Sequence, residues 1–187
     1  MRSFVRSSPR YILSSLPAAL LVLVALSQLT GTGHAQNAES AKAFMDSVFA
    51  DYRHQGKHLH PDTYYLTPSL RALVDDDNNA ANKVSQMPVS GDGDLICNCQ
   101  EMDGIWISKQ SIRLTAPRHA EFTTTFALFQ TPLPPDDSGS LRTMRYVLVF
   151  AGGQWRIDDI ATLYPPPGSS LRADLLKDLK YFKNPEP

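Results

Sequence analysis

The sequence predicts an α+β domain in which helices precede an antiparallel sheet and a further helix closes the chain. Three observations support this prediction. Apolar side chains recur at helical spacing in residues 39–55, they alternate with polar ones in several segments after Asp94, and leucines return at helical spacing in residues 171–182. The chain has 187 residues, which is enough to bury one hydrophobic core without help from metals or disulfides.

The first 35 residues have the organisation of a secretory signal peptide. Three arginines and no acids precede an apolar run from Leu16 to Leu26, whose 11 residues are short for a membrane-spanning helix. Gly33 and Ala35 are the small residues that a signal peptidase requires, so we expect cleavage after Ala35. We therefore expect a periplasmic or secreted protein with no membrane segment after cleavage. The alternative is an uncleaved N-terminal anchor.

The mature chain is expected to form one domain over residues 36–182, followed by a frayed tail at 183–187. Loss of the leader removes three arginines from 18 basic residues and none of the 19 acidic ones, which leaves a net charge of −4. The mature sequence has no basic stripe, so we expect no nucleic-acid partner.

Helical spacing predicts the first helix over residues 39–55, with Gly56 ending it. A second, short helix is predicted over "LTPSLRALVDDD", with Thr67 as its N-cap. Residues 78–86 add a further turn or two. We expect Asp75–Asp77 to cap the end of one helix and the start of the next.

Strands are expected after Asp94, because β-branched and aromatic residues become frequent there. The predicted strands, in chain order, are residues 104–108, 111–115, 118–130, 141–151 and 154–160. Gly152 and Gly153 predict a tight hairpin turn between the last two strands. The closing helix over residues 171–182 follows a serine cap.

The stretch "DGDLICNCQEMDG", the later "GGQWRIDDI" and the leucine-rich last helix resemble a family of uncharacterised bacterial envelope proteins. The resemblance covers residues 41–179. It implies a nuclear transport factor 2-like, or cystatin-like, cone, in which N-terminal helices pack on a curved antiparallel sheet. In such proteins an Asp-containing loop runs into a strand with a Gln–acid pair, and these features correspond here to Asp94 and to Gln100 with Glu101.

Asp159 is the candidate for acid–base chemistry. Strict alternation in "WRIDDI" places it on the same face as Trp155 and Ile157, toward the mouth of the cone. A carboxylate beside apolar side chains has a raised pKa, as a general acid or base requires. The alternative is a structural role at the strand end, with bonds to backbone N–H groups or to an arginine.

Cys97 and Cys99 would meet an oxidising compartment after export. In a strand their Cα atoms would lie about 6–7 Å apart, which is at the upper edge of disulfide geometry. We interpret them as small buried residues or a local bridge, with a redox pair as the alternative. We expect no metal site, because two cysteines are too few ligands for zinc and Gly56 interrupts the histidines of "HQGKHLH".

These features favour a protein that binds a small molecule or a protein partner, without a cofactor, over an enzyme. The candidate binding residues are Tyr65, Asp94, Gln100, Tyr146, Trp155 and Asp159. One alternative is a small pocket enzyme of isomerase or hydrolyase type that uses Asp159. Another is an inhibitor or immunity-type protein with a protruding acidic loop at Asp75–Asn79 or Pro134–Gly139. The fold is also compatible with a homodimer.

Overall fold

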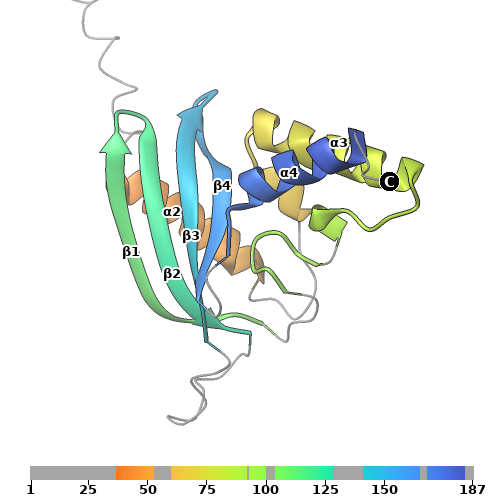
Figure 1. Ribbon diagram of the computed structural model, residues 1–187. Coiled ribbons are helices and arrows are strands. Elements are labelled where there is room, and N and C mark those ends of the chain that lie inside the picture. Colours follow the sequence, from red (N-terminus) through yellow and green to blue (C-terminus); the bar gives the residue numbers. More distant parts are fainter. Residues whose placement is uncertain are drawn as a thin grey trace, which may run out of the picture. The chain divides into compact units, whose positions relative to one another are not determined.

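Figure 1 shows the computed structural model of the chain, which describes residues 37–52, 60–91, 93–99, 104–128, 141–164 and 168–183. All of these residues belong to one compact unit, His34–Pro187. The predicted leader over residues 1–35 lies outside the described residues, and so does the loop Pro134–Gly139. Lys183, which was predicted to start the frayed tail, is the last residue of a helix.

Four antiparallel strands form one sheet in chain order. They are β1 (Trp106–Ala116), β2 (His119–Ala127), β3 (Leu141–Ala151) and β4 (Gln154–Tyr164). Each strand pairs with the next one along the chain, so the sheet is a meander, and it is curved (Figure 1). The α+β prediction is confirmed, because the described residues combine this sheet with three α-helices.

β1 is one strand where the sequence predicted two. Its pairing with β2 shifts by one residue between Ile107 and Lys109, so Ser108 is the extra residue of a β-bulge. Unbroken alternation would put Ile107 and Ile112 on opposite faces of the sheet. The bulge returns both to one face, where they pack against the core.

The predicted turn between β3 and β4 is present. Gly152 and Gly153 have φ angles of 60° and 83°, the left-handed backbone that a type I′ hairpin turn requires at both positions. The turn aligns Ala151 with Gln154 and so sets the register of the two strands. β4 runs beyond its predicted end at residue 160 and reaches Tyr164.

The helix α2 (Ala38–Tyr52) lies across one face of the sheet (Figure 1). The ring of Phe49 lies at the centre of this contact. Its centroid is 5.8, 5.9 and 6.2 Å from those of Tyr146, Phe126 and Phe122, and all four side chains are fully buried. Aromatic pairs at such distances contribute about 0.5–1.5 kcal/mol beyond the burial of their surface. The largest side chains of the core therefore fill the space between α2 and the sheet.

Two further helices, α3 (Pro68–Lys83) and α4 (Leu171–Lys183), pack against each other beside the β4 edge of the sheet (Figure 1). α3 begins as predicted, because Oγ1 of Thr67 accepts a hydrogen bond from the backbone N–H of Leu70 at 3.2 Å. The chain just before α3 also covers the sheet edge, since the N–H of Thr67 donates to the carbonyl oxygen of Ile157 at 2.8 Å.

The predicted break within α3 is wrong. Asp77 lies on the buried face of the helix together with Val74 and Ala81, and its Oδ2 accepts from the hydroxyl of Ser90 at 3.3 Å. The burial of Leu70, Val74 and Ala81 on this face outweighs the low helix propensity of the Asp and Asn residues in the run. The stretch Asp75–Asn79 is consequently helical and does not form the protruding acidic loop expected of an inhibitor.

Candidate functional site

The predicted direction of Asp159 is wrong. The pairing of β4 with β3 shifts by one residue between Ile157 and Asp159, so Asp158 is the extra residue of a second β-bulge. Beyond the bulge Ile160, only 3% exposed, takes the inward position. The alternation that grouped Asp159 with Trp155 holds only for an unbroken strand.

The two carboxylates at this bulge attach both neighbouring helices to the sheet. Oδ1 of Asp159 accepts hydrogen bonds from the backbone N–H groups of Ile160 and Arg172, each at 2.9 Å, and so caps the first turn of α4. Oδ1 of Asp158 accepts from Nη2 of Arg172 at 2.7 Å and from Oγ1 of Thr67 at 2.8 Å. Asp159 therefore has the structural role that the sequence left as the alternative.

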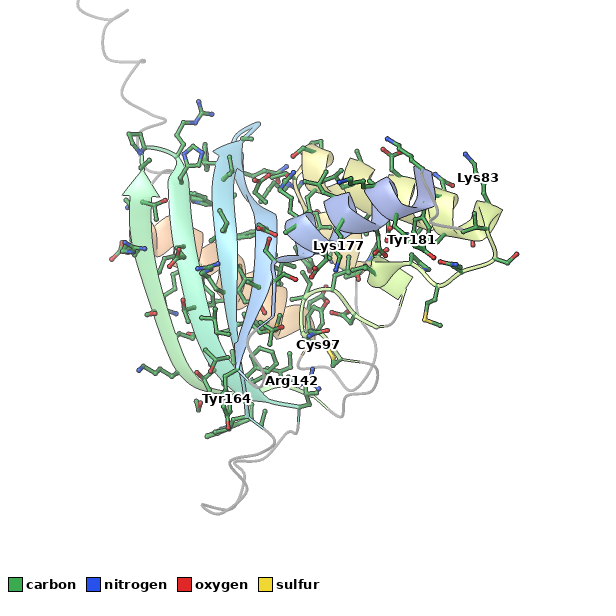
Figure 2. All side chains as sticks on the ribbon, in the orientation of Figure 1. Lys83, Cys97, Arg142, Tyr164, Lys177 and Tyr181 are labelled. Atoms are coloured by element: carbon green, nitrogen blue, oxygen red, sulfur yellow. A yellow bond between two sulfur atoms is a disulfide. The ribbon has the colours of Figure 1, made fainter. Side chains whose placement is uncertain are left out.

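The cysteines form a disulfide in a tight turn and not in a strand (Figure 2, label Cys97). Asn98 between them has a φ of 49°, which turns the backbone and brings the Cα atoms of Cys97 and Cys99 to 5.2 Å. The expected spacing of about 6–7 Å assumed an extended segment and does not apply here. We call residues 93–99 the cysteine loop.

Asp94 holds the cysteine loop against the core. Its Oδ1 accepts from the backbone N–H groups of Ile96 at 2.8 Å and Cys97 at 3.1 Å. From α2, the hydroxyl of Tyr52 donates to Oδ2 of Asp94 at 2.7 Å. From β3, the hydroxyl of Tyr146 donates to the carbonyl oxygen of Ile96 at 2.6 Å. Two core tyrosines thus fix the loop to a helix and to the sheet.

Burial raises the pKa of each ionisable group in this cluster. Desolvation raises the pKa of Asp94 and the nearby charge of Asp62 adds to the rise, while the hydrogen bond from Tyr52 opposes it. The pKa values of Tyr52 and Tyr146 rise through burial first and through the charge of Asp94 second. Both phenols are therefore protonated at neutral pH and act as hydrogen-bond donors.

A cleft of about 210 Å³ opens beside Asp94. Its floor is apolar, because Met144 and Ile160 form it and both are almost fully buried. Its rim carries polar side chains from the cysteine loop, the end of β4, the segment before α4 and the first turn of α4, among them Asn98, Thr162, Ser169 and Asp174. Pockets for drug-sized ligands measure roughly 300–1,000 Å³, so this cleft suits a smaller molecule.

The other predicted site residues have different partners. The hydroxyl of Tyr65 donates to Oδ2 of Asp51 at 2.5 Å, and Nε1 of Trp155 donates to Oγ of Ser40 at 2.9 Å. Gln100 lies outside the described residues. Of the predicted set, Asp94 and Tyr146 belong to one cluster, while Tyr65, Trp155 and Asp159 serve as separate attachments of the chain.

Sequence reasoning did not single out two arginines that meet at one carbonyl oxygen. Nη2 of Arg71, on α3, lies 3.3 Å from the carbonyl oxygen of Tyr64, and Nη1 of Arg156, on β4, lies 2.6 Å from the same oxygen. The two arginines are far apart in the sequence, so no local motif connects them. The start of α3 and the register of β4 bring them together.

Comparison with known proteins gives no match to a family model, to a curated protein or to a solved structure. Within the described ranges, no three His, Cys, Asp or Glu side chains gather as a metal site would require. None of the helices described is both long enough and apolar enough to cross a bilayer.

Proposed function

We propose that this chain is an exported, non-enzymatic binding protein. One observation supports this choice over an enzyme: the groups suited to acid–base chemistry hold the fold together. Asp159 caps α4, and the hydroxyls of Tyr52, Tyr65 and Tyr146 all donate to acceptors inside the protein. Asp94, beside the cleft, is itself occupied by hydrogen bonds from Tyr52 and from two backbone N–H groups. A general acid or base must reach the substrate, and these groups are committed to the protein.

The nuclear transport factor 2-like, or cystatin-like, cone is part of this proposal. A helix laid across one face of a curved four-stranded meander, with a closing helix at the end of the chain, supports it (Figure 1). The predicted leader and the Cys97–Cys99 disulfide support export, because disulfides persist in oxidising compartments.

In this proposal the ligand lies in the cleft beside Asp94. The apolar floor supplies burial for a small molecule, and the polar rim orients it. The rim is rigid before binding, since the disulfide and the hydrogen bonds of Asp94 fix the cysteine loop. A preformed site loses little conformational entropy when the ligand binds.

The test compares native and denatured masses of the protein purified from the envelope of its own host. Thr162→Trp places a large ring at the rim of the cleft, and Leu163→Trp is the matched control, because Leu163 is its neighbour on β4 and is exposed. We expect an extra small mass on the natural protein and on Leu163→Trp that is lost on denaturation, and no such mass on Thr162→Trp. Equal native and denatured masses in all three proteins would contradict the proposal. The native mass also reports whether the protein is a homodimer.

A further inference from the structure

Arg71 and Arg156 form no ion pair with a carboxylate among the described residues. The ion pairs of the described residues involve other side chains. Arg71 donates from Nε and Nη2 to the carbonyl oxygen of Thr63, at 3.0 and 2.8 Å, and its Nη2 also reaches Tyr64. Arg156 donates from Nη1 to Tyr64. Carbonyl oxygens accept hydrogen bonds but leave the positive charges in place.

Both guanidinium groups are held in fixed positions. They converge on the two middle residues, Thr63 and Tyr64, of a 3₁₀ turn, η1 (Asp62–Tyr65), which precedes α3. The guanidinium carbon of Arg156 also lies over the ring of Tyr64, 5.3 Å from its centroid. His60 stacks against the same ring, with centroids 4.3 Å apart. Because the arginines are already ordered, a ligand would not have to immobilise two long side chains.

The two arginines line one groove of about 400 Å³ between the start of α3 and the β3–β4 turn. Pro68 and Ala72 of α3 form one wall, and Gly152 and Gln154 of the hairpin form the other. Asp75, one helical turn after Arg71, also lines the groove, so the two positive charges face one negative charge. The charged side chains lining the groove thus carry a net positive charge, on a mature chain whose expected net charge is negative.

The geometry points to an oxyanion-binding site in this groove, for a ligand with a carboxylate or a phosphate group. Each guanidinium has five N–H donors in a planar fork, and the bonds to Thr63 and Tyr64 use only some of them. The remaining donors match the paired oxygens of a carboxylate or phosphate. An anion between the two guanidiniums would also relieve the repulsion of two like charges that share one carbonyl acceptor. This site is separate from the cleft beside Asp94.

The test is a titration of the full mature protein with inorganic phosphate and, separately, with citrate, at constant ionic strength. Backbone amide shifts of Ala72 and Gly152, which line the groove, are followed by NMR. We expect saturable shifts at both amides. Comparing the two titrations decides whether phosphate or carboxylate is the better ligand.

Three variants test the role of the charges. Arg71→Gln, at an exposed position, is expected to weaken binding by about tenfold or more, and Asp75→Asn to strengthen it by a few-fold. Arg113→Gln is the matched control, because Arg113 is an exposed arginine on β1 whose partner is Glu121, and we expect it to leave the affinity unchanged. Unchanged affinity in Arg71→Gln, equal weakening in Arg113→Gln, or no saturable shift with either anion would overturn the proposal.

Discussion

The helix α2 is attached to the sheet by different contacts from those that hold α3 and α4. α2 attaches to the sheet through apolar side chains, with Phe49 between the rings of Phe122, Phe126 and Tyr146. α4 fully buries Leu175, while Leu176 and Tyr181 remain about half exposed, at 53% and 45% (Figure 2, label Tyr181). α3 buries Leu70 and Val74 in the same core. Unlike α2, however, α3 and α4 are also held by carboxylate contacts, those of Asp77, Asp158 and Asp159.

This difference separates a scaffold from a region that can carry a function. Apolar packing is non-directional and insensitive to pH, whereas carboxylate hydrogen bonds depend on geometry and protonation. Both binding regions lie where the polar attachments are. The cleft beside Asp94 includes Leu171 and Asp174 of α4, and the arginine groove includes Arg71 of α3. The apolar layer contributes the buried floor of the cleft, through Met144 and Ile160.

The largest expected effect is in the apolar layer. Phe49→Ala removes a fully buried ring, so we expect the free energy of unfolding to fall by about 3–5 kcal/mol. Phe44→Ala is the control on the same helix, because Phe44 is only partly buried, and we expect a clearly smaller loss. Urea unfolding followed by circular dichroism measures both. Equal losses for the two variants would show that α2 is not centred on Phe49.

A smaller effect is expected at the β4 bulge. Asp158→Ala removes the charged acceptor of Arg172 and Thr67, so we expect a loss of about 1.5–3 kcal/mol in the same urea experiment. Asp158→Asn keeps an oxygen acceptor and is expected to lose less. A loss under about 0.5 kcal/mol for Asp158→Ala, which is typical of an ordinary surface substitution, would show that the contacts of Asp158 do not hold α3 and α4 to the sheet.

The smallest effect is a change with pH at Asp77. Its Oδ1 has no hydrogen-bond partner among the described residues, and burial raises the pKa of this carboxyl, with the charge of Asp178 adding to the rise. Because the pKa of Asp77 is higher in the folded state, protonation of this carboxyl stabilises the folded protein. This stabilisation is complete below the unfolded pKa of about 3.9 and is lost as the pH rises through the folded pKa.

Asp77→Asn cannot ionise and so avoids this loss. We therefore expect the stability of the variant relative to the natural protein to be higher at about pH 7 than at about pH 3. Urea unfolding at both pH values measures the difference. A relative stability that stays constant or falls from about pH 3 to about pH 7 would mean that ionisation of Asp77 does not destabilise the folded protein.

Regular patterns in the sequence predict the regular parts of this fold. Helical spacing places the helix that begins near residue 39, and the paired glycines place the β3–β4 turn correctly. The misses come from single residues that break a period. Ser108 and Asp158 are extra residues in bulges, and alternation rules assume that no such residue exists.

The remaining misses depend on tertiary contacts. α3 continues through its acidic run because the face with Val74 and Ala81 packs against the rest of the fold, which a local propensity cannot foresee. In the same way, Arg71 and Arg156 meet only because the start of α3 lies beside β4. The site around Asp94 is partly predictable, because the sequence singles out the loop that contains Asp94. Its partner Tyr52 is not predictable, because the helical pattern around Tyr52 indicates only that this side chain is buried.

Native-state hydrogen exchange tests the contrast between the two regions most directly. Amides protected by apolar packing should exchange only through global unfolding, and those held by a few polar contacts should exchange through local opening. We predict that the amides of Phe122 and Leu148, on β2 and β3, exchange with the full free energy of unfolding, whereas that of Leu176, an exposed residue of α4, exchanges at a free energy lower by about 1–3 kcal/mol. Equal protection of all three amides would contradict the division into an apolar scaffold and a polar, functional region.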